Sequence, residues 1–327
     1  MTRTLTGIQP SGELHLGNYF GAIEPCLRYQ EDPEADLMIF MADYHALTTV
    51  NDGQALRAHT WGLAVDLLAL GIDTEKTLLF RQSDVPAVTE LALLLSMVMG
   101  MGELQRAHSY KDKIAKGITP NVGLFFYPVL MAADILIHDT ERVPVGKDQH
   151  QHVQMAQSVA RHFNETFGPT FRIPETDISE VPKVPGVDGQ KMSKSYGNTI
   201  SPFMEGDELK KQVAQVKTSS TPFGDPLPTE GCPLLDLIKL ILDEEEGAEV
   251  QEFFRTGRRG SKLFGYGHAK EILVSGIEGR FSDARERRRE ILEDLEGVQA
   301  LVELGGDAAA WAASEKLEQA RERCGLG

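Results

Sequence analysis

The sequence predicts an α/β protein with a doubly wound parallel sheet and a second, all-helical domain. In the first half of the chain, short apolar runs alternate with stretches of helical periodicity, an order that is typical of a Rossmann-like sheet. After about residue 200 the strand patterns stop and only helical patterns follow. Pro182, Pro185, Gly186 and Gly189 mark a loop between the two halves.

Four apolar runs are expected to form buried strands, at residues 4–8, 36–42, 77–82 and 142–145. A helix over 53–70 is predicted to begin after Asp52, which can cap it, and to end before Gly71. Residues 87–102 are apolar nearly all round, which predicts one buried helix. Further helices are expected over 149–167, 233–243, 247–255, 268–275, 282–295 and 308–324.

Composition and charge exclude several classes of protein. The 327 residues include 33 Lys or Arg and 49 Asp or Glu, so the formal net charge is −16, which disfavours general nucleic-acid binding but allows a local basic patch. No apolar run approaches the ~18–20 residues that span a bilayer, and no secretory signal is visible. We therefore expect a cytoplasmic protein without membrane contact. Three distant cysteines without a CxxC pair argue against a disulfide framework or a cysteine zinc site.

A glycine-rich turn lies near the N-terminus, where residues 7–21 read GIQPSGELHLGNYFG. Ligands bind at the carboxyl ends of parallel strands, and a helix N-terminus offers free N–H groups to a phosphate. His15 and Asn18 share one helix face and can both donate to that phosphate, and Gly17 leaves room for a flat base. A plain strand–turn–helix connection is the alternative interpretation. The spacing is neither GxGxxG nor Walker A, which counts against dinucleotide oxidoreductases and P-loop enzymes.

The second motif is the run KMSKS at residues 191–195, which follows the Gly/Pro-rich loop. Lys191 and Lys194, with serines between them, offer point charges and hydroxyl donors that suit a polyphosphate. A flexible tether would let the lysines engage as charge develops in a transition state. A solvated loop is the alternative interpretation of the same five residues.

Together the two motifs resemble the signatures of class I aminoacyl-tRNA synthetases. PSGELHLGN takes the place of the HIGH sequence of that class, with His15, Leu16 and Gly17 matching and Asn18 replacing the last His. GIQPSG, YPVLMAADI at 127–135 and VPVGKDQHQH at 143–152 are similar to the bacterial tryptophanyl-tRNA synthetases. The matches are dense to about residue 200 and sparser afterwards.

The resemblance implies an enzyme that activates tryptophan with ATP and transfers it to tRNA(Trp). Mg²⁺ is expected on the ATP phosphates, with no protein-bound metal. The implied domains are a catalytic nucleotide-binding domain at 1–185, a lysine loop at 186–200, a helical anticodon-binding domain at 201–290 and C-terminal helices at 291–327 that pack back on the catalytic domain. Relatives act as homodimers, and the apolar helix at 87–102 is the candidate dimer face.

The resemblance also implies roles for individual residues. Asp134 lies in an apolar helical run, where an unpaired carboxylate would be costly, and is implied to accept the indole N–H of tryptophan; a surface Asp is the alternative. Residues implied at the amino acid are Leu5, Gln9, His45, Tyr127, Met131, Asp134, Val143, Val145 and Gln149. Residues implied at ATP are Gln9, Ser11, Gly17, Asn18, Gly146, Asp148, Lys191, Met192, Ser193, Lys194 and Ser195. The charge-stabilising catalytic set is His15, Asn18, Lys113, Lys191 and Lys194.

Two positions depart from the family pattern. Leu5 stands where many relatives have Phe, which predicts a larger pocket edge, and Lys147 stands where they usually have Glu. Both bear on selectivity and rate rather than on the reaction class. His150 and His152 are interpreted as structural, because residues two apart on a helix point in different directions. The basic residues that offer anticodon contacts, with ordinary helix-face charge as the alternative, are Arg258, Arg259, Arg285 and Arg287 to Arg289.

Three other functions remain open from the sequence. A tyrosyl-type or other adenylate-forming synthetase of the same fold would keep His15 and the lysine motif but not Asp134. A non-catalytic paralogue that binds tryptophan, ATP or a partner protein is disfavoured by the intact KMSKS. A dinucleotide oxidoreductase is disfavoured because GxGxxG is absent.

Overall fold

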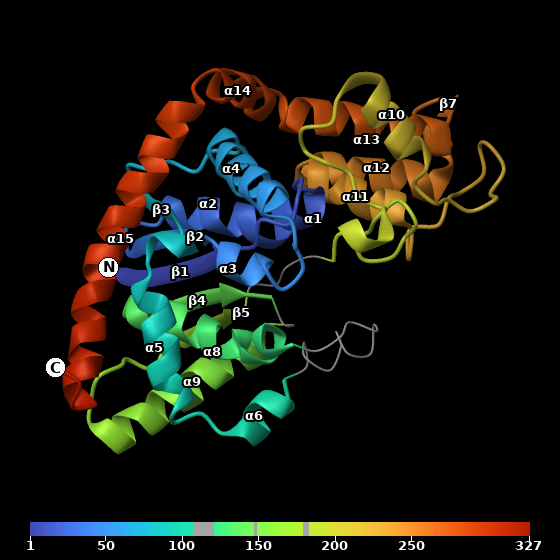
Figure 1. Cartoon of the computed structure of the whole chain (residues 1–327). Coiled ribbons are helices and arrows are strands. Elements are labelled where there is room, and N and C mark those ends of the chain that lie inside the picture. The colour runs from blue at the N-terminus through green and yellow to red at the C-terminus, as the bar shows by residue number, and fades with distance from the viewer. Residues whose placement is uncertain (108–120, 147–148, 179–182) are drawn as a thin grey trace.

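The computed structural model describes residues 1–107, 121–146, 149–178 and 183–327 of the chain (Figure 1). Within these residues five parallel strands form the main sheet in the order β3-β2-β1-β4-β5. The strands are β1 (Thr2–Ile8), β2 (Ala35–Met41), β3 (Thr77–Arg81), β4 (Arg142–Val145) and β5 (Glu175–Ile178). The order changes direction between β1 and β4, and such a switch point is where open α/β sheets bind ligands.

Helices cover both faces of this sheet. Alternate residues of β2 explain the two layers: Leu37, Ile39 and Met41 belong to one buried cluster, and Met38 and Phe40 belong to the other. The helical elements of this part are α1 (Leu16–Asn18), the π-helix η1 (Tyr19–Ile23), α2 (Glu24–Gln30), α3 (Asp43–Ala46), α4 (Gly53–Ala69), the 3-10 helix η2 (Gln82–Asp84), α5 (Ala87–Ser96), α6 (Met101–Gln105), α8 (Val122–Ile137) and α9 (His150–Phe167). The predicted fold class, a doubly wound sheet followed by a helical region, is confirmed.

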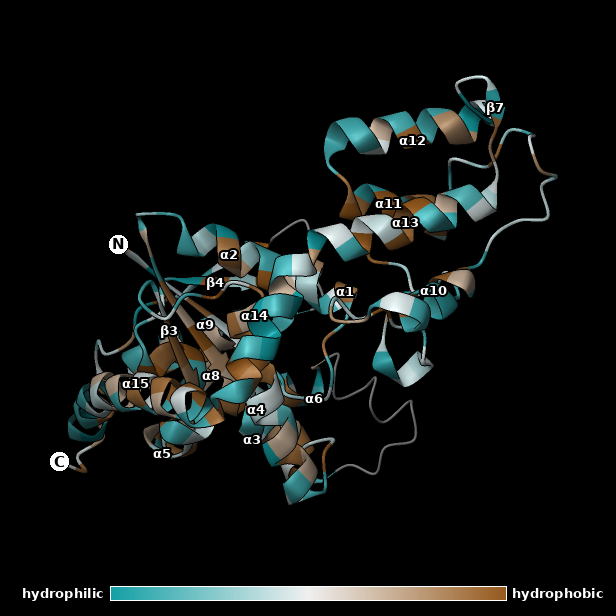
Figure 2. Ribbon diagram, turned by 90° about the horizontal axis from the view of Figure 1, so that it is seen from above, coloured by the Kyte–Doolittle hydropathy of each residue, from teal (hydrophilic) through white to brown (hydrophobic). Residues whose placement is uncertain are grey.

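The rest of the chain is mostly helical (Figure 2). Its apolar interior continues the cluster on the α2 side of the sheet, through buried residues such as Leu237 and Leu273. Its elements are the 3-10 helix η3 (Lys194–Tyr196), α10 (Gly206–Ala214), α11 (Pro233–Ile241), α12 (Glu244–Thr256), the strands β6 (Arg258–Arg259) and β7 (Lys262–Leu263), α13 (Tyr266–Arg280), α14 (Ser282–Glu293) and α15 (Leu295–Arg323).

The long helix α15 returns to the sheet and lies along β3 (Figure 1). Two glycines allow this close approach: a Cβ on Gly305 would lie 2.1 Å from the carbonyl oxygen of Leu79, and one on Gly306 would lie 2.7 Å from Cβ of Asp84. The helix therefore covers the β3 edge, which would otherwise expose unpaired backbone groups. None of the described helices combines the length and apolarity needed to cross a membrane.

Three local expectations are wrong. The helix predicted over 87–102 is interrupted, because α5 ends at Ser96 and Gly100 is extended before α6; an apolar pattern on all sides carries no end signal. The edge strand β5 was missed, since its sequence ETDI has no apolar run. Beyond residue 200, β6 and β7 form a two-residue hairpin around Gly260, whose φ is 63°.

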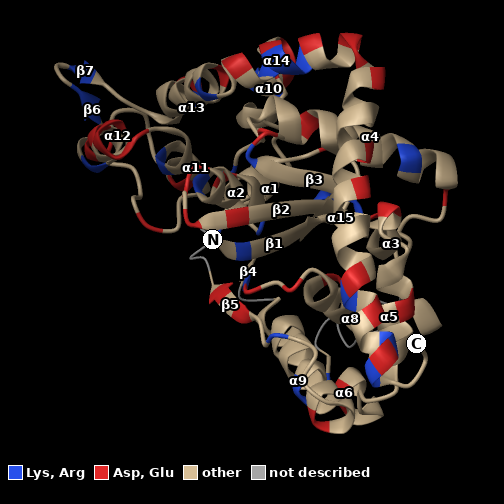
Figure 3. Cartoon of the chain, turned by 90° about the vertical axis from the view of Figure 1, so that its left-hand side faces the viewer, with Lys and Arg blue, Asp and Glu red and all other residues tan. Residues whose placement is uncertain are grey.

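Four arginines of α14, the helix with blue segments at the top of Figure 3, bond to other parts of the chain. Arg288 Nε donates to Oδ1 of the buried Asp66 on α4 at 2.7 Å, and Arg287 Nε donates to the carbonyl of Ala69 at 2.9 Å. Arg285 is buried and donates to backbone carbonyls, and Arg289 pairs with Glu205. These four arginines thus have partners within the chain, although Arg287 and Arg289 are still exposed. Arg258 and Arg259 on β6 are exposed as well, and the anticodon role of all six arginines stays a prediction.

Candidate functional site

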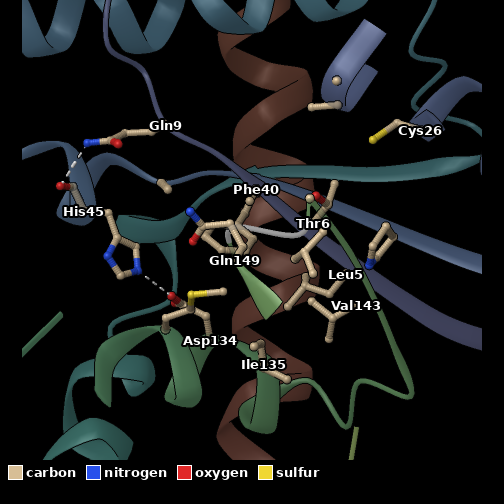
Figure 4. Close-up of a pocket in the computed structure, with 18 of the residues that line it drawn as sticks. Leu5, Thr6, Gln9, Cys26, Phe40, His45, Asp134, Ile135, Val143 and Gln149 are labelled. Atoms are coloured by element: carbon tan, nitrogen blue, oxygen red, sulfur yellow. Dashed lines mark hydrogen bonds and ion pairs between the residues drawn. The ribbon is translucent and has the colours of Figure 1, made fainter. Parts of the chain in front are cut away.

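A cavity of about 420 Å³ opens at the switch point, beside the carboxyl ends of β1 and β4 (Figure 4). This volume is in the range of small-molecule sites. Its apolar lining comes from β1, β2, α8 and β4, and the sequence-predicted residues among it are Leu5, Met131, Val143 and Val145. Its polar lining includes Gln9, His45, Tyr127, Asp134 and Gln149. All nine residues expected at the amino acid therefore border one cavity.

Phe40 of β2 also borders the cavity, although no sequence pattern singled it out. Gly7 makes room for its ring, because a Cβ there would lie 2.4 Å from Cζ of Phe40. Leu5 and Gly7 are two apart on β1, so they face the same side as α8. An aromatic side chain thus borders the site from β2 although position 5 is Leu.

Asp134 is the buried acceptor of the site, with 2% of its surface exposed. His45 Nε2 donates to its Oδ2 at 3.0 Å, and Gln82 Nε2 lies 2.9 Å from Oδ1 and 2.8 Å from Oδ2. Burial raises the pKa of Asp134, and the hydrogen bonds from His45 and Gln82 act in the opposite direction. The alternative interpretation as a surface Asp is wrong.

Gln82 is a second residue at this site that sequence reasoning missed. It is 1% exposed and sits at the carboxyl end of β3, in η2. A signal was available in the sequence. Gln82 is the last residue of the predicted strand 77–82, and His45 follows the neighbouring predicted strand at the same edge of the sheet. A polar side chain at that position is expected to face the ligand crevice.

Tyr127 of α8 and Gln149 are joined through His152 of α9. His152 Nδ1 donates to Gln149 Oε1 at 2.9 Å, so its Nε2 accepts the Tyr127 hydroxyl proton at 2.8 Å. Burial raises the pKa of Tyr127, which therefore stays protonated at neutral pH. His152 is buried and organises this wall of the cavity.

In the described part of the chain no cluster of His, Cys, Asp or Glu is arranged to hold a metal ion.

The first motif forms the predicted turn, and its helix begins at Leu16. His15 caps the helix: its Nδ1 accepts from the Asn18 N–H at 3.2 Å, and Asn18 Oδ1 accepts from the His15 N–H at 3.2 Å. Burial, and then the charge of Lys194, lower the pKa of His15 to about 4. The ring is thus neutral at pH 7, and its proton is on Nε2. Gly17 is required here, because a Cβ would lie 2.9 Å from Nδ1 and Cε1 of His15.

The two motifs meet in space although they are far apart in sequence. Lys194 Nζ donates to Ser11 Oγ at 3.2 Å, and the N–H of Leu16 donates to the carbonyl of Ile200 at 2.8 Å. Asn198, which is 1% exposed, holds the lysine segment by accepting the Ser193 N–H at 2.8 Å and donating to the Lys191 carbonyl at 3.2 Å. The second motif is therefore docked against the first.

Solved structures share the fold of this chain. The family model described as tRNA synthetases class I (W and Y) matches residues 1–282. The chain belongs to this family. The resemblance inferred from the motifs is thereby confirmed.

A tryptophan–tRNA ligase of Campylobacter jejuni is 45% identical to this synthetase. The match covers 99% of this chain and 100% of that relative. One of Fusobacterium nucleatum is 44% identical, with all of the chain matching 98% of that relative. The solved structure of the Campylobacter jejuni tryptophanyl-tRNA synthetase complexed with ADP and tryptophan superposes with a TM-score of 0.90, covering 99% of this chain and 100% of that one.

The remaining predicted residues of the synthetase lie as follows. Gln9 Nε2 donates to the His45 carbonyl at 3.1 Å, and Gly146 borders the cavity after β4. Met192 is buried, whereas Lys191 and Ser195 are exposed on the lysine segment. Three residues named from the sequence, Lys113, Lys147 and Asp148, lie outside the described residues.

Proposed function

We propose that this chain is a cytoplasmic tryptophan–tRNA ligase that uses ATP and forms AMP. The observation that carries the proposal is the buried Asp134 carboxylate, which faces the cavity while Lys194 and His15 converge at the nearby turn. A buried carboxyl acceptor beside the apolar side chains of the pocket suits the single N–H of an indole ring. The identity to tryptophan–tRNA ligases over nearly the whole chain supports the same assignment.

The amino-acid subsite is proposed to bind tryptophan through shape and three polar groups. Asp134 accepts the indole N–H, and Met131, Val143 and Val145 contact the ring. The Tyr127 hydroxyl donates a hydrogen bond to His152, and its oxygen is proposed to accept one from the substrate ammonium group, with Gln149 beside it. An amino acid without a ring N–H leaves Asp134 unsatisfied, which is the basis of its rejection.

The nucleotide subsite is proposed to lie along the first motif. His15 Nε2 and the Asn18 amide donate to phosphate oxygens, and Lys113, Lys191 and Lys194 stabilise charge on the leaving pyrophosphate. Ser11, Gly17, Gly146, Asp148, Met192, Ser193 and Ser195 contact the rest of ATP, and Mg²⁺ accompanies its phosphates.

The reaction needs positioning and charge stabilisation, and no protein nucleophile. The tryptophan carboxylate attacks the α-phosphorus of ATP in line, and the bond to pyrophosphate breaks. A ribose hydroxyl of tRNA(Trp) then attacks the activated carbonyl, and AMP leaves. The helical region at 201–290 is proposed to contact the anticodon, with the exposed Arg258 and Arg259 of the β6–β7 hairpin as basic contacts (Figure 3).

The proposed activity is tested by amino-acid-dependent exchange between pyrophosphate and ATP. We expect exchange with tryptophan and at most background exchange with tyrosine or without an amino acid. Exchange driven by tyrosine would indicate the tyrosyl-type alternative. Binding of tryptophan without any exchange would indicate the non-catalytic paralogue.

We further propose that the ligase is a homodimer that uses the surface of α5 and α6. Three large apolar side chains are exposed there: Leu93 by 54%, Met97 by 69% and Met101 by 62% of their surface. Met97→Glu is expected to shift the molar mass in light scattering from dimer toward monomer, because a charge would be buried at the interface. Leu326→Glu, at an exposed position near the C-terminus, is the control. An unchanged mass for Met97→Glu would exclude this surface.

A further inference from the structure

We propose that Gln82 is the positioning residue for tryptophan selection, because it aims the Asp134 carboxylate and keeps it an acceptor. This inference rests on the proposed function, in which Asp134 reads the indole N–H. Gln82 does not line the cavity. It acts through Asp134, which does line the cavity and which it contacts. Its role is therefore distinct from that of the residues expected to touch the substrate.

The orientation of the Gln82 amide is fixed by its two ends. Its Oε1 accepts from the backbone N–H groups of Tyr44 and His45 at 3.1 and 3.4 Å. A flipped amide would set its NH₂ group against these two donors, so Nε2 must face Asp134. Since Gln82 is 1% exposed, water cannot take over either end of the amide.

The bonds to Asp134 are unequal, which selects one oxygen for the ligand. Among the described residues, Oδ2 receives both His45 Nε2 and Gln82 Nε2, whereas Oδ1 receives Gln82 Nε2 alone. A carboxylate has about four acceptor positions, two on each oxygen. Oδ1 therefore keeps an acceptor position, and we assign it to the indole N–H.

Gln82 also joins the loops that surround the amino-acid subsite. By holding the His45 N–H it fixes the residue whose carbonyl accepts Gln9 Nε2 at 3.1 Å. The neighbouring Ser83 N–H donates to Asp43 Oδ1 at 3.0 Å, which ties the same two strand ends together. The contacts of Gln82 reach the tryptophan subsite but not Lys194 or His15, so its loss should affect tryptophan more than ATP.

The electrostatic consequence is a pH dependence that a purely structural residue would not have. The charged and titratable groups that face Asp134 are His45 and Asp43, with Tyr127 in the same cavity wall. Burial already raises the pKa of Asp134, and the Gln82 bond opposes this rise. Removing Gln82 removes a bond that lowers this pKa, so Asp134 becomes protonated at a higher pH than in the wild-type protein and, once protonated, accepts a weaker hydrogen bond.

The test uses Gln82→Met in the full chain, assayed by tryptophan-dependent pyrophosphate exchange between about pH 6 and 9. We expect KM for tryptophan to rise about 10- to 100-fold at pH 7, in line with the loss of a bond to a charged group, with kcat and KM for ATP changed by less than about threefold. The rise in KM should shrink as pH increases, because Asp134 then ionises again. Wild-type KM should vary less with pH over this range.

Gln30→Met is the matched control. Gln30 also has both amide ends bonded, to the Gly71 carbonyl and the Asp73 N–H, but it lies away from the cavity. Gln82→Glu is the second variant if Gln82→Met does not fold. It keeps an acceptor for the Tyr44 and His45 N–H groups, and it replaces the amide donor with a carboxyl group that must share a proton with Asp134, which weakens Asp134 as an acceptor. It should raise KM for tryptophan at least tenfold.

The outcomes separate the inference from the proposed function. Equal losses in KM for tryptophan and for ATP, a pH-independent change, or an effect no larger than that of Gln30→Met would overturn the role of Gln82. Absence of tryptophan-dependent exchange in the wild-type protein would instead contradict the proposed function.

Discussion

Replacing Lys194 with Ala is expected to lower kcat for tryptophan-dependent pyrophosphate exchange by about 10²–10³-fold, with KM for tryptophan nearly unchanged. Lys194 Nζ already touches the first motif at Ser11, and burial lowers its pKa while Glu13 and Asp66 oppose that effect. A donor aimed at developing charge in a partly dry site contributes about 3–4 kcal/mol to the transition state. Tryptophan is bound at the cavity, which Lys194 does not line.

Lys210→Ala provides the control for Lys194→Ala. Lys210 is an exposed lysine of α10, paired only loosely with Asp207 at 3.8 Å. Its replacement should leave exchange unchanged. If Lys194→Ala weakened tryptophan binding, measured by equilibrium titration, as much as it lowered kcat, the lysine would be a ground-state binding residue and the assigned role would be wrong.

The sequence predicted the sheet well because buried parallel strands are short apolar runs. Where burial is incomplete the signal disappears, as in the edge strand β5 with its sequence ETDI. The two motifs were found because glycine-rich turns and clustered lysines are rare combinations, and Lys194 and Ser11 do meet. The roles of the individual site residues, and the domain boundaries at 185, 200 and 290, stay predictions.

Other features depend on tertiary contacts that a pattern does not encode. Arg288 looked like a basic surface residue until the fold placed it beside the buried Asp66. Gln82 is one polar residue at a strand end, and its importance comes from three partners on two other elements. Phe40 became a wall of the cavity only because Gly7 on the neighbouring strand has no side chain.

The second large effect is expected for Asp134→Asn, which should lower kcat/KM for tryptophan by about 10³-fold. Asn keeps the size of Asp but offers one acceptor oxygen, whereas three donors converge on this position: His45 Nε2, Gln82 Nε2 and the proposed indole N–H. Each carboxylate oxygen serves two of these contacts, so the Asn NH₂ group that replaces one oxygen would face two donors. Each buried donor left without a partner costs about 1–3 kcal/mol, so two of them account for the expected loss.

The measurement that decides the role of Asp134 is selectivity rather than activity alone. The preference for tryptophan over phenylalanine, taken as the ratio of kcat/KM in the exchange assay, should fall in Asp134→Asn, since phenylalanine has no N–H to lose. The exposed Asp207→Asn is the matched control, and a thermal melt checks that the variant is folded. A folded Asp134→Asn that kept the wild-type ratio would show that the cavity selects tryptophan by the shape of its apolar wall, through side chains such as Phe40 and Val143, and not by its ring N–H.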